Sequence, residues 1–400
     1  MPDLLPLSLS RRGPSRIRPD LAALEATLAA LGSPHAGLRS VLVVGTNGKG
    51  STVAMLDAIL AAHGLRVGRF TSPHLVSVSE RVTIDGAPIT DATLARLLGT
   101  VDRFDDLTFF ETLTAVALMA FAEARVDIAV LEAGMGGRWD ATRTAASEIA
   151  GLTNVGTDHA RWLGTTREAI AHDKGAALAA AAVGIVGPGV DAAIRPHLDA
   201  PAAIDAATLV GLEVVDGPRC VASWPGARVE VTVPLDGPHQ RDNLQLALAL
   251  ARAAADRGWL SLDPGCVRGG LQRVTWPGRL SWHHIEGRRV LLDGAHNLEA
   301  ATALAATLEA VSLRPHLVFS CLDDKPVEAM ARVLSPVVAS VTLCVLDDER
   351  AMPMERLQAA FPDARTVADP RLALARTPDP ALAAGSLRLV GTLLEDAEVA

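Results

Sequence analysis

The chain has 400 residues, of which 49% are hydrophobic, 21% are charged and 3% are aromatic, a length and composition that fit two domains with sizeable cores. Its formal net charge of −9 argues against a general nucleic-acid surface, and no uncharged apolar run is long enough to cross a bilayer. The four cysteines lack the spacing of a metal site or a disulfide framework, which fits free thiols. Because the first residues do not read as a signal peptide, we expect a cytoplasmic protein.

In the first part of the chain, short β-branched runs alternate with longer helical patterns, which is typical of an α/β fold with a mainly parallel sheet. Strands are predicted at 41–44, 66–70, 127–131, 149–154 and 184–186, and helices at 20–31, 52–62, 91–98 and 111–124. Turn residues and strand-like runs at 210–233 predict a small β excursion, and a long helix is expected at 243–257.

The segment WPGR at 276–279 interrupts this alternation, and we place a domain boundary there, which gives domains 1–277 and 278–400. A second alternation follows, with strands predicted at 290–292, 317–320, 337–346, 364–367 and 387–390. Ligands of open α/β sheets bind at the carboxyl ends of the strands. We therefore expect an active site between the two domains.

The most informative segment is GTNGKGST at 45–52, which lies between an apolar β-type run and a helical pattern. Strand, glycine loop and helix start together hold phosphates, because backbone N–H groups, the helix dipole and a lysine all present positive charge. We therefore predict a nucleotide site with Lys49 at its centre. The general P-loop pattern has Gly where Val43 stands and Ser or Thr where Gly50 stands, so a glycine turn without a ligand is the alternative.

Three polar residues, Glu132, Ser72 and His159, each follow an apolar strand run. Carboxyl ends of parallel strands share one edge of a sheet, so we expect these residues near Lys49. A carboxylate at that position can hold Mg²⁺ or polarise a magnesium-bound water. The alternatives are a solvated glutamate, a turn serine before a proline, and a structural or solvated histidine.

Other residues have two interpretations each. Lys174 lies on a predicted helix, where spacing alone favours a solvated cation. The pair Phe109 and Phe110 fits either core packing or a stacking wall for a flat ligand. In the second domain, Asp293 and His296 follow a strand, where a helix-capping turn and a ligand site are both compatible with the spacing.

Taken together, these segments resemble the folylpolyglutamate synthase and dihydrofolate synthase family, within the wider Mur ligase superfamily. The matching motifs run in the family's order over nearly the whole chain: GTNGKGST at 45–52, TSPHL at 71–75, SERVTIDGAPIT at 79–90, FFETLTAVAL at 109–118, LEAGMGGRWDAT at 131–142, GTDHARWLGTT at 156–166, NLQLALALA at 243–251, WPGRL at 276–280, LLDGAHN at 291–297 and LDDKP at 322–326. The implied fold is α/β, with a P-loop N-terminal domain that has a mainly parallel sheet and a smaller Rossmann-like C-terminal domain.

The resemblance implies an ATP-dependent amide ligase that adds L-glutamate to dihydropteroate or to a reduced folate through an acyl phosphate. It implies ATP contacts at Thr46, Asn47, Gly48, Lys49, Gly50, Ser51, Asn243, Arg279 and Asp293. It implies two Mg²⁺ ions held by Ser72, Glu132, His159 and Lys174, the last as a carbamylated lysine. It implies a pterin pocket at Thr108, Phe109, Phe110, Glu111, Trp139, Asp140 and Ala141, and gives His296 a role in positioning the second substrate.

The chain departs from the family pattern at two places near these residues. Arg143 stands where Asn is usual, and Gly175 follows Lys174 where Ala is usual. The alternative functions are a Mur-type ligase acting on a UDP-muramyl peptide and a non-catalytic P-loop nucleotide-binding protein. The implied partners are small molecules, without nucleic acid or membrane, and the family expectation is a monomer.

Overall fold

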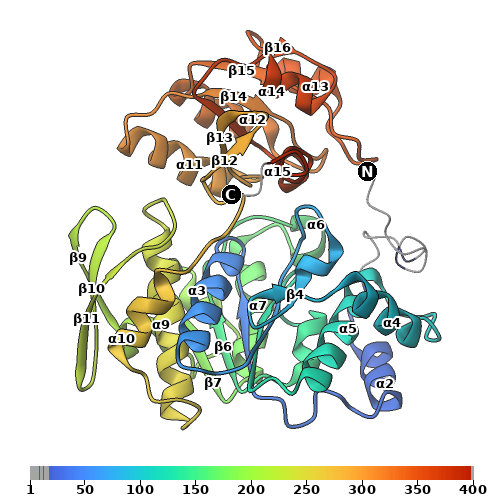
Figure 1. Ribbon diagram of the computed structural model, residues 1–400, viewed down its shortest axis with the longest axis vertical. Coiled ribbons are helices and arrows are strands. Elements are labelled where there is room, and N and C mark those ends of the chain that lie inside the picture. The colour runs from blue at the N-terminus through green and yellow to red at the C-terminus, as the bar shows by residue number, and fades with distance from the viewer. Residues whose placement is uncertain (1–8, 10–11, 13–17, 398–400) are drawn as a thin grey trace. The chain divides into compact units, whose positions relative to one another are not determined.

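The computed structural model describes residues 9, 12 and 18–397. The chain folds into two units (Figure 1). Unit 1 runs to Pro234 and also includes Gln240–Val274, whereas unit 2 consists of Leu235–His239 and the chain from Thr275 onwards. The main division therefore falls just before the predicted boundary at 277/278, and the sequence pattern gave no sign that five residues at 235–239 group with unit 2.

Unit 1 contains an eight-stranded sheet with the order β4-β3-β2-β5-β1-β6-β7-β8. Strands β2, β5, β1, β6, β7 and β8 are parallel, whereas β3 and β4 add antiparallel pairs at one edge. The bounds are β1 Ser40–Val44, β2 Val67–Phe70, β3 Val82–Ile84, β4 Ala87–Pro88, β5 Ile128–Glu132, β6 Ile149–Leu152, β7 Val183–Val186 and β8 Ile204–Asp205. Every residue of β1, β5 and β6 is buried, as parallel strands covered on both faces require.

The helices of unit 1 cover this sheet. Helix α3 packs against α9 and α10, α5 packs against β2 and β3, and α7 packs against β6 and β7 (Figure 1). The bounds are α2 Ala22–Ala30, α3 Lys49–Ala62, α4 Asp91–Val101, α5 Phe109–Ala124, α6 Ala160–Leu163, α7 Arg167–Ala180, α8 Ala206–Leu209, α9 Gln240–Asp256 and α10 Pro264–Leu271, with 3₁₀ turns η1 Val78–Arg81, η2 Ala141–Ala145 and η3 Arg195–His197. Helix α3 begins three residues before the predicted start.

The predicted β excursion is confirmed as a separate three-stranded antiparallel sheet. Its strands are β9 Gly211–Asp216, β10 Arg219–Trp224 and β11 Ala227–Thr232. In β10 and β11 buried and more exposed residues alternate, which is the pattern of strands with one covered face.

Unit 2 has a six-stranded sheet with the order β12-β13-β17-β14-β15-β16, in which only the β12–β13 hairpin is antiparallel. The strands are β12 Ser281–Ile285, β13 Arg288–Leu292, β14 His316–Phe319, β15 Ser340–Leu343, β16 Arg365–Thr366 and β17 Ala381–Ala384. The helices are α11 Leu298–Ala310, α12 Val327–Leu334, α13 Met354–Ala360, α14 Pro370–Ala375 and α15 Leu387–Leu394, with the 3₁₀ turn η4 Ser335–Val337.

The strand predicted at 387–390 is wrong, because these residues begin helix α15. The side chains of Leu389, Val390 and Leu393 are buried at helical spacing, and Ser386 caps the first turn by accepting a hydrogen bond from the Arg388 N–H. The strand is instead β17, whose small alanines lie fully buried between β13 and β14. The strand predicted at 337–346 is also shorter, since only Ser340–Leu343 is extended.

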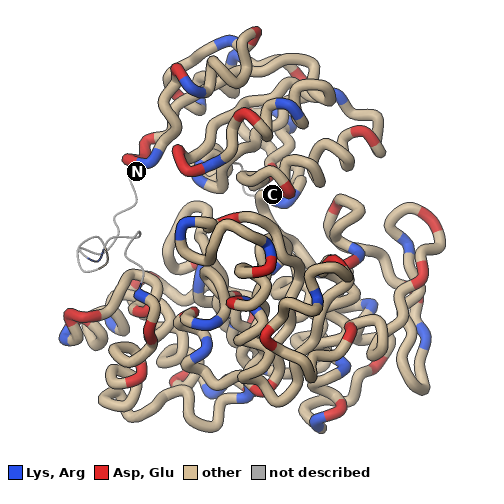
Figure 2. The backbone as a smooth tube through the Cα atoms, turned by 180° about the vertical axis from the view of Figure 1, so that it is seen from behind, with Lys and Arg blue, Asp and Glu red and all other residues tan. Residues whose placement is uncertain are grey.

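Positive and negative residues are interspersed along the backbone of both units (Figure 2), in keeping with the net charge of −9. Among the described residues, no helix combines the length and apolar content that a bilayer crossing needs. The cysteines Cys220, Cys266, Cys321 and Cys344 are all free thiols, as predicted, and three of the four are buried.

Candidate active site

The glycine loop after β1 is held in shape by the chain that follows β6. The Asn47 N–H donates to Asn154 Oδ1 at 2.9 Å, Thr153 Oγ1 donates to the Asn47 carbonyl at 2.6 Å, and the Gly156 N–H donates to Thr46 Oγ1 at 2.9 Å. Gly48 adopts φ +82° immediately before α3, a conformation that favours glycine. The start of the 14-residue helix α3 therefore sits on a braced loop, which is the arrangement of an anion site.

Asn243 of α9 lies directly against this loop. A Cβ atom on Gly48 would collide with Asn243 Oδ1, so the close approach requires glycine at position 48. Asn243 is buried and donates to Gln240 Oε1 at 2.9 Å. Unit 1 thus brings together two predicted nucleotide residues that lie almost 200 positions apart.

Two lysines converge on one carbonyl of the loop. Lys49 Nζ donates to the carbonyls of Gly45 and Thr46, each at 3.1 Å, and Lys174 Nζ donates to the Gly45 carbonyl at 2.9 Å. Lys174 is buried on α7, and burial, reinforced by the nearby charge of Lys49, lowers its pKa from 10.5 to about 7. The interpretation of Lys174 as a solvated cation, which spacing alone favoured, is therefore wrong.

The departure at Gly175 has a packing reason. A Cβ at this position would collide with the backbone N of Asp199 and approach Leu198. The chain passes so close to α7 here that only glycine fits behind Lys174.

Glu132 and Ser72 are neighbours, as the parallel sheet predicts. Glu132 ends β5 and is buried, and its Oε2 accepts a hydrogen bond from the Ser72 N–H at 3.0 Å. A carboxylate at the end of β5 and a hydroxyl oxygen two residues after β2 therefore lie at the same end of the sheet.

His159 lies at the start of α6, where it is exposed and has φ +60°. Among the described residues, no three His, Cys, Asp or Glu side chains form a metal-binding cluster.

Thr108 and Glu111 have a structural role at the start of α5. They form a capping box in which the Thr108 N–H donates to Glu111 Oε2 at 2.7 Å and the Glu111 N–H donates to Thr108 Oγ1 at 3.2 Å. The cap accounts for the buried carboxylate of Glu111. Phe110 is more exposed than Phe109 and lies against Gly134, where a Cβ would come within 2.7 Å of its ring.

In the segment that follows the glycine loop after β5, one side chain is exposed and one is buried. Trp139 is 49% exposed. Asp140 is buried, accepts hydrogen bonds from the Met135 N–H at 2.9 Å and the Thr142 N–H at 3.0 Å, and has a raised pKa because of burial. Ala141 begins η2 and is buried.

In unit 2, Asp293 follows β13, and its carboxylate joins two segments of the backbone. Its carboxylate accepts hydrogen bonds from the Leu280 and Ala295 N–H groups, both at 2.8 Å, and burial raises its pKa despite the nearby Arg279. His296 Nδ1 lies 2.8 Å from the Gly294 carbonyl. Unit 2 therefore collects Arg279, Asp293 and His296 around one strand end.

Lys325 is a further candidate site residue that was not predicted from the sequence. It lies in the segment between β14 and α12, its side chain is 7% exposed, and its Nζ is 3.2 Å from Asp324 Oδ2. Ser320, directly after β14, has a buried Oγ without a hydrogen-bond partner. The signal was present in the sequence, because the chain has 37 lysines and arginines and only three of them are lysines: Lys49, Lys174 and Lys325. A chain that uses arginine almost everywhere keeps lysine where a compact amine is needed.

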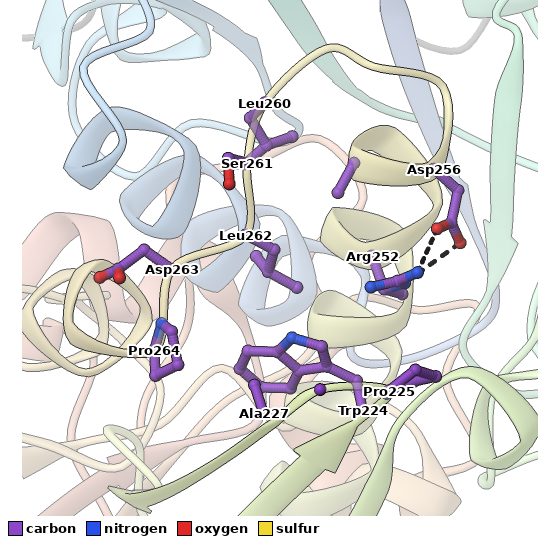
Figure 3. A pocket seen from close by; sticks show the side chains of 12 residues that line it. Trp224, Pro225, Ala227, Arg252, Asp256, Leu260, Ser261, Leu262, Asp263 and Pro264 are labelled. Atoms are coloured by element: carbon purple, nitrogen blue, oxygen red, sulfur yellow. Dashed lines mark hydrogen bonds and ion pairs between the residues drawn. The ribbon is translucent and has the colours of Figure 1, made fainter.

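A pocket of about 470 Å³ in unit 1 shares no residue with these groups (Figure 3). Its wall includes Trp224, Leu260 and Pro264. Of its charged residues, Arg252 and Asp256 form an ion pair with each other, and Asp263 caps α10 by accepting a hydrogen bond from the Cys266 N–H. Because these charged groups are engaged with each other or with a helix cap, the pocket lacks the convergent polar groups that mark a ligand site.

Comparison with known proteins gives the family. Residues 43–182 match the Mur ligase middle domain, and residues 278–390 match the Mur ligase glutamate ligase domain. The dihydrofolate synthase/folylpolyglutamate synthase of Mycobacterium tuberculosis is 35% identical over 388 residues, covering 88% of this chain and 80% of that protein. This chain belongs to the folylpolyglutamate synthase/dihydrofolate synthase family. It is an ATP-dependent ligase of folate metabolism.

Other members of the family extend the comparison. A probable bifunctional folylpolyglutamate synthase/dihydropteroate synthase of Haloferax volcanii is 36% identical over 367 residues, and this chain spans 43% of its length. The structure of Escherichia coli FolC with DHPP and ADP has a TM-score of 0.86 at 28% identity and covers 97% of this chain and 95% of its own. A Yersinia pestis member with Mn, AMPPNP and L-glutamate has a TM-score of 0.84 at 28% identity, covering 97% and 96%.

Proposed function

We propose that this chain transfers the γ-phosphoryl group of ATP to the carboxylate of dihydropteroate or a reduced folate, and then joins that carboxyl carbon to the amino group of L-glutamate. The observation that carries the proposal is the convergence of Lys49 and Lys174 on the Gly45 carbonyl at the start of α3. Bringing a polyphosphate and a carboxylate together requires positive charge, which this loop, its helix and Lys49 supply. The relatives with bound DHPP and L-glutamate support this substrate class.

The reaction has two steps. A carboxylate oxygen of the acceptor attacks the γ-phosphorus, the bond to ADP breaks, and an acyl phosphate forms. The glutamate nitrogen then attacks the acyl carbon, loses a proton, and expels inorganic phosphate to leave the amide. Lys49 would hold the β- and γ-phosphate oxygens with Thr46, Asn47, Gly48, Gly50 and Ser51 as backbone neighbours.

The residues near Lys49 fit a bound divalent cation. Ser72 and Glu132 offer hard oxygen ligands at the ends of two adjacent strands, the donor type that Mg²⁺ prefers. Such a cation would act as a Lewis acid on the phosphate oxygens. We propose that His159 joins a second metal position.

We also propose that Lys174 carries a carbamate. Its buried amine with a lowered pKa is available as the neutral base near pH 7, and a neutral lysine nitrogen can add to carbon dioxide with loss of one proton. The product is an oxygen ligand, which would remove the conflict between two ammonium groups at one carbonyl.

The acceptor would bind beside Phe110 and the exposed Trp139, which flank the glycine loop after β5. Flat aromatic surfaces suit a pterin ring by stacking. Phe109, Asp140 and Ala141 would shape the base of this pocket, while Thr108 and Glu111 hold the start of α5.

For the amino-acid substrate we propose Lys325, which follows β14, together with His296, which follows β13. A buried ammonium can form a charge-assisted hydrogen bond with a substrate carboxylate. We further propose that the protein acts as a cytoplasmic monomer.

The test is phosphate release from ATP and Mg²⁺ with L-glutamate and one acceptor at a time. Dihydropteroate and tetrahydrofolate are the two acceptors, and a UDP-muramyl peptide is the control. We expect release that depends on glutamate and on at least one pterin acceptor, with none above background for the control. Release with the UDP-muramyl peptide alone would contradict the proposal.

A further inference from the structure

The loop between Glu132 and Asp140 contacts three functional elements of unit 1. It starts at Glu132, whose carboxylate accepts the Ser72 N–H. At Gly134 it touches the Phe110 ring, and at Gly137 a Cβ would come within 2.8 Å of both Cα and the carbonyl oxygen of Lys174. The loop therefore rests on the backbone of the buried lysine itself, and a shift of the loop would move the surroundings of all three side chains.

Two charged side chains hold the end of this loop through its backbone. Asp173 Oδ1 accepts a hydrogen bond from the Gly137 N–H at 2.7 Å. On the next residue, the Arg138 carbonyl accepts a short hydrogen bond from the Arg143 guanidinium. Asp173 comes from α7, directly before Lys174, and Arg143 comes from η2. The loop is thus fastened to the helix of the lysine on one side and to the acceptor segment on the other.

We propose that Asp173 and Arg143 are positioning residues for the ligase reaction, which hold the loop 133–138 so that Glu132, Lys174 and Phe110 keep their mutual placement. The proposal rests on the function proposed above. Arg143 stands where the family pattern usually has Asn, and its longer side chain reaches the Arg138 carbonyl. Displacements of about 1 Å in such a site can cost about 10²-fold in rate.

The chain offers a matched control in Asp199. Its carboxylate pairs with the side chain of Arg138 at 2.7 Å, so its removal deletes an ion pair on the same loop and leaves both backbone hydrogen bonds in place. Both partners of this ion pair are partly exposed, and such pairs contribute little to stability.

The experiment compares Asp173→Ala, Asp173→Asn, Arg143→Ala, Arg143→Lys and Asp199→Ala. For each variant, kcat and the KM values for ATP and for the acceptor are measured, with amide hydrogen exchange of the peptide covering 133–139. We expect kcat to fall about 10- to 100-fold in the two alanine variants at 173 and 143, with the ATP KM within about twofold. Exchange at 133–139 should rise in the same two variants. The conservative variants should recover most of the loss, because Asn still offers an oxygen and Lys still offers a donor.

The inference is overturned if Asp173→Ala and Arg143→Ala behave like Asp199→Ala in kcat and in exchange. It is also overturned if activity is lost together with exchange protection across the whole of unit 1 and the conservative variants bring no recovery, since that pattern means general unfolding. Absence of turnover in the wild-type protein would contradict the proposed function instead. The exchange rates test the loop contacts whether or not the protein turns over substrate.

Discussion

The two units use the ends of their parallel strands in different ways. In unit 1, a glycine loop, two lysines and a carboxylate gather at the ends of β1, β5 and β2, and both lysines donate to one carbonyl. In unit 2, the carboxylate of Asp293 accepts the Ala295 N–H of its own turn and the Leu280 N–H directly before β12, and the single lysine pairs with an adjacent aspartate. The strand ends therefore carry a dense cluster of ionisable groups in unit 1 and a few separate polar contacts in unit 2.

From this difference we expect phosphoryl transfer to depend mainly on unit 1 and substrate binding mainly on unit 2. Positive charge at a site stabilises the phosphoryl group during its transfer. Removing that charge therefore lowers kcat. Residues that hold a substrate before it reacts contribute to ground-state binding. Removing one of them therefore mainly raises KM. The two units should therefore respond to mutation with different kinetic signatures.

The largest effect is expected for Lys49→Ala in unit 1. Removal of the loop cation should lower kcat by about 10³-fold, because its charge acts on the transferring oxygens. Lys49→Arg is the matched variant, since it keeps the charge and changes the shape. Phosphate release measured at saturating ATP checks the result, and a kcat within about threefold of wild type in Lys49→Ala would remove Lys49 from the phosphate site.

Glu132→Ala should lower kcat by about 10²-fold and raise the Mg²⁺ concentration needed for half-maximal rate, because one oxygen ligand is lost. Glu123→Ala is the control, since this exposed glutamate of α5 pairs with the surface residue Arg96. Titration of the rate with Mg²⁺ distinguishes them. An unchanged magnesium dependence in Glu132→Ala would contradict the metal assignment.

In unit 2, Lys325→Ala should raise the KM for glutamate about tenfold with little change in the KM for ATP. Lys325→Arg keeps the charge and should recover part of the loss. Initial rates at varied glutamate and fixed ATP give the comparison. Equal rises in both KM values would show a general disturbance of unit 2 in place of a substrate contact.

Asp293→Ala should destabilise unit 2 by about 2 kcal/mol, because the Leu280 and Ala295 N–H groups lose their acceptor. From the resemblance we also expect a higher KM for ATP. Asp369→Ala removes an equivalent acceptor at the cap of α14 and should lower stability without that rise. Denaturant unfolding and steady-state kinetics measure the two effects, and identical kinetics for both variants would limit Asp293 to a structural role.

The last prediction concerns the stability contributed by Lys174. Its pKa of about 7 in the fold lies below the unfolded value, so the unfolded chain binds more protons between pH 7 and pH 10. In that window the unfolding free energy of the metal-free, carbon-dioxide-free protein should rise with pH by about 1.4 kcal/mol per unit relative to Lys174→Met. Denaturant titrations at pH 7, 8 and 9 check the slope. A constant difference between the two proteins would contradict the lowered pKa.

Most of the fold of unit 1 could be predicted because its strands are apolar runs bounded by glycine loops. In unit 2 the pattern failed at β17, since Ala381–Ala384 carries no strand propensity and is extended only because β13 and β14 enclose it. The neighbouring Leu387–Val390 has the apolar content of a strand, yet Ser386 starts a helix there. Burial decided both cases, and burial is not visible in a short window of sequence.

For the site, spacing placed Glu132 and Ser72 correctly at one sheet edge and misjudged Lys174. The lysine is 129 positions from the carbonyl it contacts, and no local pattern reports such a contact. The capping role of Thr108 and Glu111 was readable as a Thr-x-x-Glu motif. Lys325 could have been found from the scarcity of lysine, because a composition this biased toward arginine makes each remaining lysine informative.

The central claim is that the acceptor carboxylate is activated by phosphoryl transfer. The most direct test uses an acceptor labelled with ¹⁸O in its reacting carboxylate, together with ATP, Mg²⁺ and L-glutamate. Transfer through an acyl phosphate predicts that each inorganic phosphate released carries one labelled oxygen from the acceptor, as read by mass spectrometry. Unlabelled phosphate formed in step with the amide product would contradict the account.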